Sequence, residues 1–202
     1  MDLSHKPRLL VVEGLDGAGT TTQAALLSGA LRQAGRPVHL TAEPSDGPIG
    51  RLLRSHVRGE LDLDPQAAAL AFTADRADHL TRTVRPALAR GMDVVCDRYL
   101  LSTLAYQGAQ GVDREWILRA SSGLDIPAVT VFLDLPEPAR RQRLESRTHV
   151  DRWDPPDLAA DLRASYSESI RLLREAGQRV EVVSSAGAEQ DVLREILALL
   201  PL

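Results

Sequence analysis

The stretch from Arg8 to Thr22, RLLVVEGLDGAGTTT, constrains the fold of this chain more than any other. An apolar run ends at Glu13 and Gly14, a glycine-rich loop follows, and residues 23–35 then have helical apolar spacing. This order fits the phosphate-binding pattern G-x-x-x-x-G-K-[ST], in which backbone N–H groups and a helix N-terminus hold a phosphate. The candidate phosphate-binding residues are Gly14, Leu15, Asp16, Gly17, Ala18, Gly19, Thr20, Thr21 and Thr22.

One position of the loop departs from that pattern. Thr20 stands where the pattern has lysine, so the loop lacks the cation that contacts the β- and γ-phosphates. A tight turn without a ligand is therefore an alternative for the loop taken alone, and the rest of the chain must decide between the two.

Length and composition bound the class of protein. A chain of 202 residues suits one globular domain, which we expect to span residues 1–202. The net charge of −4 argues against a nucleic-acid-binding protein, whereas the many arginines suit contacts with small phosphorylated ligands. Apolar runs fall short of the roughly 20 residues that span a membrane, and residues 1–6 lack the order of a secretory signal. We expect a cytoplasmic protein with no membrane or nucleic-acid partner.

Strand patterns alternate with helical patterns along the rest of the chain. After the first strand, further strands are predicted at 37–41, 93–97, 128–133 and 179–183. Helices are predicted at 49–57, 64–90 with a bend at Pro86, 102–107, 113–122, 137–146, 157–177 and 189–200. Such alternation predicts an α/β fold whose parallel sheet is covered on both faces. Ligands of these folds bind beyond the carboxyl ends of the strands, where Glu13, Glu43, Asp97 and Asp134 fall.

Two pairs of residues have the chemistry of a nucleotide site. Asp97 and Arg98 end a strand, so the carboxylate can hold Mg²⁺ while the guanidinium binds a phosphate. Phe72 and Arg76 lie four residues apart on one helix and share a face, where they can stack on a base and hydrogen-bond it. An ordinary salt bridge for the first pair, and a core phenylalanine with a solvated arginine for the second, are the alternatives.

A cluster of arginines precedes a polar, proline-broken segment. The spacing places Arg140, Arg143 and Arg147 on roughly one helix face. Arg147 and Arg152 flank or lie in residues 147–156, which we expect to form a short lid that brings positive charge to a transferred phosphoryl group.

Several of these motifs together resemble the thymidylate kinase (dTMP kinase) family of P-loop kinases. They are EGLDGAG, the EP after the second strand, LAFTADR, VVCDRYLLSTLAYQG and the arginine-rich segment that ends in DRW, and they cover about Leu9 to Tyr166. The resemblance implies a P-loop NTPase three-layer fold with a five-stranded parallel sheet. It also implies phosphoryl transfer from Mg²⁺-bound ATP to dTMP by a homodimer. Gly17, with arginines in the lid instead of the loop, is similar to the bacterial type.

The resemblance implies a role for each residue that matches a family motif. Around the phosphates, Asp16 would contact the sugar 3′-hydroxyl, Arg98 would hold the acceptor phosphate, and Thr21 and Asp97 would lie near Mg²⁺. Around the acceptor nucleoside, Phe72 would stack on thymine, Arg76, Ser102 and Thr103 would contact the base, and Tyr106 would exclude a 2′-hydroxyl. Glu43 and Pro44, joined by a peptide bond that is often cis, would form a turn beside the acceptor, which Gln107 would also contact.

Two departures from the family pattern shape the functional prediction. The loop after Pro44 has no arginine before Arg51, so one phosphate contact of the family is expected either to be absent or to be replaced by Arg51. Thr20 removes a cation, and we expect Arg147 and Arg152 to supply it, which makes Asp16, Arg98 and these two arginines the predicted catalytic set. A catalytically weak or silent nucleotide-binding homologue, and a kinase of another deoxynucleotide, stay open as alternatives.

Overall fold

The computed structural model describes residues 6–145 and 159–200. Its centre is a sheet of five parallel strands in the order β2-β3-β1-β4-β5. The strands are β1 (Leu9–Gly14), β2 (Val38–Ala42), β3 (Asp93–Asp97), β4 (Val129–Asp134) and β5 (Val180–Ser184). This arrangement confirms the predicted five-stranded parallel α/β fold, and each predicted strand lies within one or two residues of the observed one.

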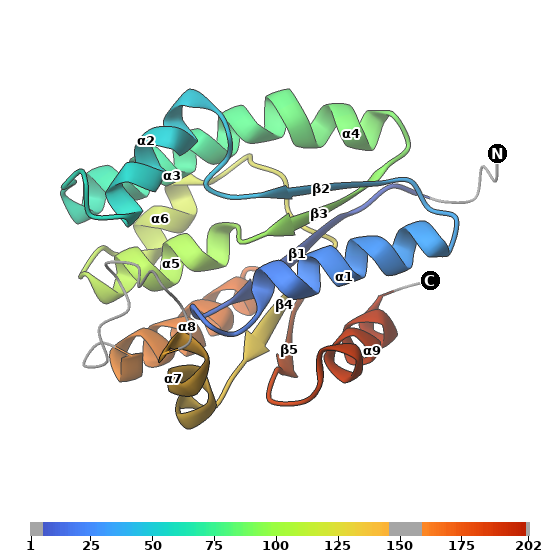
Figure 1. Ribbon diagram of the computed structural model, residues 1–202. Helices are drawn as coiled ribbons and strands as arrows, with labels where there is room; N and C mark the ends of the chain where they lie inside the picture. Colours follow the sequence, from blue (N-terminus) through green and yellow to red (C-terminus); the bar gives the residue numbers. More distant parts are fainter. Residues whose placement is uncertain (1–5, 146–158, 201–202) are drawn as a thin grey trace.

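Helices cover both faces of the sheet (Figure 1). They are α1 (Thr20–Gln33), α2 (Pro48–Val57), α3 (Pro65–His79), α4 (Arg85–Ala89), α5 (Leu100–Ala109), α6 (Arg114–Ala120), α7 (Glu137–Glu145), α8 (Ala159–Glu175) and α9 (Glu189–Leu199). Within the described residues, no helix is long and apolar enough to cross a membrane. The prediction of a single domain with a lid at 147–156 stays a prediction, because all of that lid lies outside the described residues.

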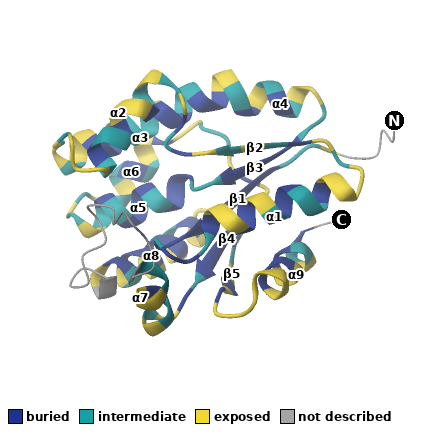
Figure 2. Ribbon diagram, in the orientation of Figure 1, coloured by how far each residue is buried: buried dark blue, intermediate teal, exposed yellow. Residues whose placement is uncertain are grey.

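Successive side chains of the central strand point to opposite faces, and each face has its own core. Leu9 and Val11 belong to a cluster that includes Leu104 of α5 and Tyr166 of α8. Leu10 and Val12 belong to a second cluster, which includes Leu27 and Leu31 of α1 and Ile196 of α9. All six residues of β1 are buried, as Figure 2 shows for the middle of the sheet. A strand buried on both faces gives the continuous apolar run seen in the sequence.

The long helix predicted from residue 64 to 90 is divided by a π-helical turn. Asp64 is the N-cap of α3, as predicted, and its Oδ1 accepts hydrogen bonds from the backbone N–H groups of Gln66 and Ala67 at 2.9 and 3.3 Å. The π-helical turn, η1 (Leu80–Val84), then joins α3 to α4 directly before Pro86. Proline cannot donate a backbone hydrogen bond, so the ordinary α-helical pattern is interrupted at this place.

Helix α5 differs from its predicted bounds at both ends. It begins at Leu100 instead of Ser102, and it continues through Gly108, where the sequence predicted a break. Arg114 packs against Gly108: a Cβ at this position would lie 2.5 Å from the Arg114 Nε, so the Arg114 side chain would have to move. The glycine therefore serves close packing inside the helix and does not end it.

Candidate active site

The glycine-rich loop connects β1 to the N-terminus of α1 and lies against α7. Gly17 and Gly19 have φ angles of 89° and 93°, which favour glycine. A Cβ on Gly17 would lie 3.3 Å from Leu144 and 3.4 Å from Arg140, both on α7. Gly19 is the N-cap of α1 and has no side chain to occupy the first N–H groups of the helix. The loop and the helix dipole thus present donors to an anion.

Thr20 contributes packing to this loop and no charge. It is buried, and its methyl group would be 3.1 Å from a Cβ on Gly14. The side chain at the lysine position is therefore held against the end of β1. The cation that the loop pattern calls for has to come from another segment.

Thr21 and Asp97 meet as the sequence predicted. The Thr21 hydroxyl donates to Asp97 Oδ2 at 2.6 Å, which joins the start of α1 to the end of β3. The second oxygen, Oδ1, is buried and has no hydrogen-bond partner among the described residues. A carboxylate oxygen and a hydroxyl beside a phosphate-binding loop are ligands that Mg²⁺ prefers, so these residues fit the ion.

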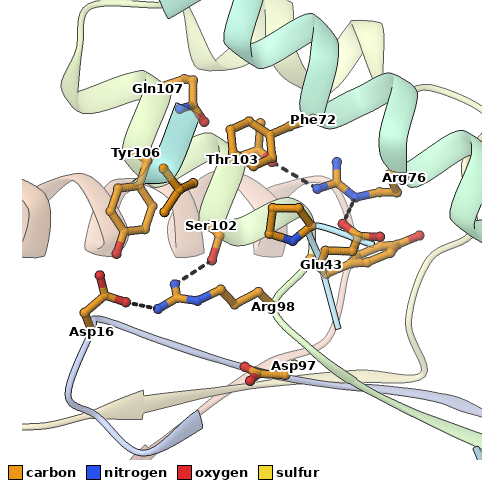
Figure 3. A pocket seen from close by; sticks show the side chains of 13 residues that line it. Asp16, Glu43, Phe72, Arg76, Asp97, Arg98, Ser102, Thr103, Tyr106 and Gln107 are labelled. Carbon is orange, nitrogen blue, oxygen red and sulfur yellow. Dashed lines mark hydrogen bonds and ion pairs between the residues drawn. The ribbon is translucent and has the colours of Figure 1, made fainter. Parts of the chain in front are cut away.

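Arg98 lies between the loop and the neighbouring cavity. Its Nη2 forms an ion pair with Asp16, and its Nη1 donates to the Gly14 carbonyl at 3.0 Å and to Ser102 Oγ at 3.2 Å. The guanidinium also lies over the Tyr106 ring, 5.8 Å from its centroid. Figure 3 shows Arg98 and Asp16 turned toward each other below Ser102 and Tyr106. Arg98, the predicted contact to the acceptor phosphate, and Asp16, the predicted contact to the sugar, are therefore neighbours.

A cavity of about 200 Å³ opens beside Arg98 (Figure 3). Predicted residues that line it are Asp16, Glu43, Pro44, Phe72, Arg76, Asp97, Arg98, Ser102, Thr103, Tyr106 and Gln107. Val57 and Tyr99, which the sequence analysis did not select, line it as well. The Glu43–Pro44 peptide bond is cis, as the family resemblance implied. The structure thus brings almost the whole predicted acceptor set into one cavity, while the individual roles stay predictions.

Arg76 is a buried residue of this cavity, which rules out the alternative of a solvated arginine. Its Nε donates to Glu43 Oε2 and its Nη2 donates to Thr103 Oγ1, both at 2.9 Å. The guanidinium carbon lies 4.7 Å from the centroid of the Tyr99 ring. The third nitrogen, Nη1, is buried and has no hydrogen-bond partner among the described residues. A buried donor without a partner is uncommon in proteins, and Arg76 is one of the residues that line the cavity.

Some predicted residues do not contribute to this arrangement as expected. Arg51 is exposed at the start of α2, donates to the Asp46 carbonyl at 2.6 Å and does not line the cavity. Arg147 and Arg152 lie outside the described residues. The Ser102 hydroxyl contacts Arg98 and Glu13, so its contact with the base stays a prediction.

Arg143 is a loop contact that the predicted site set omitted. From α7, its Nη1 lies 3.4 and 3.5 Å from the carbonyls of Gly17 and Ala18, and its Nη2 donates to the Ser185 carbonyl at 2.9 Å. Arg140, by contrast, is buried and pairs with Glu137 at 2.7 Å. The shared helix face of these arginines was visible in the sequence, but the close approach of α7 to the loop was not.

Glu13 has a structural role in place of the nucleotide contact that its strand-end position suggested. Its Oε1 accepts from the backbone N–H groups of Tyr99 and Ser102 at 2.7 and 3.1 Å, and its Oε2 accepts from Ser102 Oγ at 2.5 Å. The carboxyl group of β1 therefore caps the N-terminus of α5. Burial raises the pKa of Glu13 from 4.5 to about 7, although these hydrogen bonds oppose the change.

We expect Glu13→Gln to flatten the dependence of stability on pH. Because the folded-state pKa lies above the unfolded value, the contribution of Glu13 to stability is fully present below pH 4.5 and lost as the pH rises through about 7. The pKa difference corresponds to about 3 kcal/mol. Glutamine keeps the oxygen that accepts both N–H groups. Urea unfolding from pH 5 to 8 measures the effect, with Glu195→Gln on the exposed face of α9 as the control. An unchanged slope for Glu13→Gln contradicts this account.

Comparisons with known proteins agree with this geometry. The family model "Thymidylate kinase" matches residues 12–196. A probable thymidylate kinase of Pyrococcus abyssi (strain GE5 / Orsay) is 36% identical over 196 residues, with 94% of each chain covered. The thymidylate kinase of Thermomicrobium roseum is 43% identical over 155 residues, with 74% of each chain covered. The solved structure of Candida albicans thymidylate kinase superposes with a TM-score of 0.79 at 25% identity, covering 96% of this chain and 91% of that one. The chain belongs to the thymidylate kinase family.

Proposed function

We propose that this chain transfers the γ-phosphoryl group of ATP to dTMP, with ADP and dTDP as the products. Membership of the thymidylate kinase family supports this reaction over the alternatives of a silent homologue or a kinase of another deoxynucleotide. The single observation that carries the proposal is the position of Arg98, which contacts the phosphate-binding loop at Gly14 and Asp16 and also lines the neighbouring cavity. An acceptor phosphate at Arg98 would face a donor phosphate on the loop.

In this proposal dTMP occupies the cavity. Phe72 stacks on the thymine, and Arg76 Nη1 donates to a carbonyl oxygen of the base. Tyr106 lies against the deoxyribose, where a 2′-hydroxyl would be excluded, and Asp16 contacts the 3′-hydroxyl. The acceptor phosphate needs no general base, since a phosphate monoester is already largely dianionic at neutral pH. Positioning and charge neutralisation are what the reaction requires.

ATP and Mg²⁺ occupy the loop side. The N–H groups of the loop and of the first turn of α1 hold the phosphates, and the cavity lined by Gly19, Thr22 and Arg143 adjoins them. Thr21 and Asp97 are the residues that would hold Mg²⁺, which supplies charge neutralisation between the phosphates. Arg147 and Arg152 supply the cation that Thr20 does not.

The quaternary structure and location are also proposed from the family resemblance. We propose a homodimer, for which Leu52 on α2 and Leu70 on α3 offer exposed apolar side chains, 46% and 49% accessible in this chain. The free and buried Cys96 is consistent with a reducing cytoplasm. Light scattering of the purified protein tests the dimer.

A coupled assay of ADP release tests the proposed reaction. The enzyme is given ATP with dTMP, dCMP, dGMP or UMP, with and without Mg²⁺. We expect turnover that requires Mg²⁺ and favours dTMP, because an Arg76 donor placed at the C4 carbonyl oxygen of thymine would meet an amino group at C4 of cytosine, and Tyr106 disfavours the ribose of UMP. Calorimetric binding of ATP and dTMP without ADP formation would instead identify a catalytically silent homologue.

A further inference from the structure

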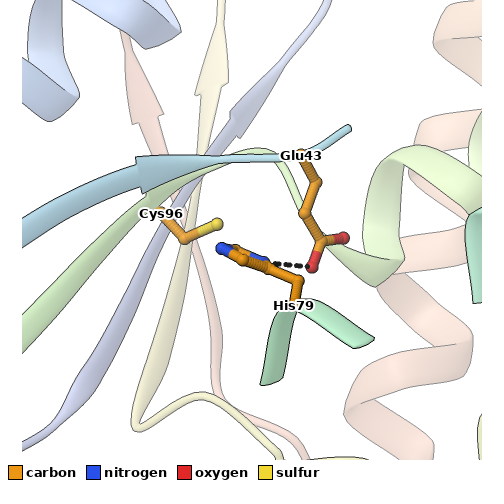
Figure 4. Close-up of side chains that lie close together, drawn as sticks. All are labelled: Glu43, His79 and Cys96. Atoms are coloured by element: carbon orange, nitrogen blue, oxygen red, sulfur yellow. Dashed lines mark hydrogen bonds and ion pairs between the residues drawn. The ribbon is translucent and has the colours of Figure 1, made fainter. Parts of the chain in front are cut away.

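A chain of buried polar groups runs behind the cavity from β2 to Arg76. His79 Nε2 lies 2.7 Å from Thr41 Oγ1, and His79 Nδ1 lies 3.2 Å from Glu43 Oε1. Glu43 Oε2 in turn accepts from Arg76 Nε at 2.9 Å. Figure 4 shows the imidazole of His79 turned toward the Glu43 carboxylate. We propose that His79 is a positioning residue for the acceptor base, acting on Arg76 through Glu43.

The hydrogen-bond donors and acceptors in this network indicate which ring nitrogen of His79 carries the hydrogen. A carboxylate only accepts hydrogen bonds, so Nδ1 carries the hydrogen that faces Glu43. In the neutral ring Nε2 is then an acceptor, and the Thr41 hydroxyl donates to it. Both His79 ring nitrogens are satisfied in this way. Side-chain exposures of 2% for His79 and 5% for Glu43 leave almost no water to replace either bond.

The hydrogen-bonded network of Thr41, His79 and Glu43 restricts the motion of the Arg76 side chain. Arginine has a long side chain with several rotatable bonds, and Arg76 lines the cavity while its Nη1 has no hydrogen-bond partner among the described residues. Two contacts orient its guanidinium, Glu43 on one edge and Thr103 on the other. His79 fixes the Glu43 carboxylate from the opposite side, so Arg76 meets a stationary partner. A binding group held in place before the ligand arrives loses less entropy on binding.

A metal site is the other interpretation of this cluster. Glu43, His79 and Cys96 offer ligand atoms that lie within 4.8 Å of one another. In the structure, however, both Glu43 oxygens have protein partners, and the Cys96 thiol donates to the Arg98 carbonyl at 3.1 Å. The two nitrogens of His79 also face different groups, Thr41 and Glu43. These contacts favour a hydrogen-bonded support over a metal centre.

The test compares His79→Leu with His79→Asn and Thr41→Val. Leucine removes the donor to Glu43, whereas the asparagine amide can place an N–H near the position of Nδ1. Because the lost bond involves a charged group, we expect His79→Leu to raise KM for dTMP about tenfold and to lower the preference for dTMP over dCMP by a similar factor. KM for ATP and kcat should change less than twofold. His79→Asn should restore most of the KM, and Thr41→Val should give a smaller rise in the same direction.

This inference depends on the proposed occupancy of the cavity by dTMP, so Arg76→Ala is measured alongside. If Arg76→Ala leaves KM for dTMP unchanged, the proposed acceptor site is wrong. If Arg76→Ala raises KM while His79→Leu and Thr41→Val leave it within twofold of the parent, the site stands and the positioning role is overturned. A uniform loss of kcat on every substrate, with melting temperature reduced, would show a merely structural histidine. One equivalent of tightly bound transition metal in the purified protein, lost in the His79 variants, would also overturn the proposal.

Discussion

Replacing Arg98 by alanine is expected to lower kcat/KM for dTMP by about a thousandfold. The removal of one well-placed donor to developing negative charge costs on the order of 10² to 10³ in rate, and Arg98 provides a full charge with forked donors. The residue is held in place by Gly14, Asp16 and Ser102, so its guanidinium is oriented before substrate binds. Steady-state kinetics with dTMP varied at saturating ATP measure the loss.

Arg98→Lys is the matched variant for this prediction. Lysine keeps the charge but lacks the planar fork, so we expect it to recover only part of the lost activity. Both variants retain a side chain at a residue whose φ is 69°, and backbone strain is therefore the same in each. A kcat/KM for Arg98→Ala within tenfold of the parent enzyme would remove Arg98 from the catalytic set.

Arg147→Ala and Arg152→Ala are each expected to reduce kcat by about a hundredfold or more, because they are proposed to supply the missing cation. Adding Thr20→Lys should restore most of that loss, since lysine at this position of the loop contacts the same phosphates. In the parent chain Thr20→Lys should change kcat less than tenfold. Kinetics of the single and combined variants separate these effects.

The control for this set is Arg141→Ala. Arg141 is exposed on α7 and pairs with Glu137 at 2.9 Å, so its removal lowers the positive charge of the helix without touching the loop. We expect near-parental turnover from it. Near-parental turnover from both Arg147→Ala and Arg152→Ala would eliminate the proposed compensation, and a hundredfold gain from Thr20→Lys alone would show that nothing replaces the lysine.

The fold could be predicted from the sequence because its signals are local. A strand buried on both faces has a continuous apolar run, as in β1, and Asp64-Pro65 marks the start of α3 through capping chemistry that needs no distant partner. The start of α5 was misplaced for the opposite reason. Its first turn is capped by Glu13, which is 86 residues away from Tyr99 in the chain.

The sequence predicted which residues form the candidate site more fully than it predicted which side chains contact one another. Asp16 and Arg98 follow the ends of β1 and β3, which lie at one edge of the sheet, and Phe72 and Arg76 share a face of α3. All four line one cavity. The support behind these residues could not be predicted, because one-dimensional spacing does not say which buried side chains touch. His79 and Glu43 come from α3 and the end of β2, and only the packed structure shows their hydrogen bond.

The close packing of α7 against Gly17 limits how this loop can change in evolution. A Cβ at that position would lie 3.3 Å from Leu144 and 3.4 Å from Arg140, so these side chains would have to shift by a few tenths of an ångström, and the φ of 89° disfavours any residue except glycine. An arginine at residue 17 would therefore introduce backbone strain and require the side chains of α7 to rearrange. Charge delivered by the loop and charge delivered by α7 therefore compete for the same space, and we expect a change from one to the other to need substitutions in both segments.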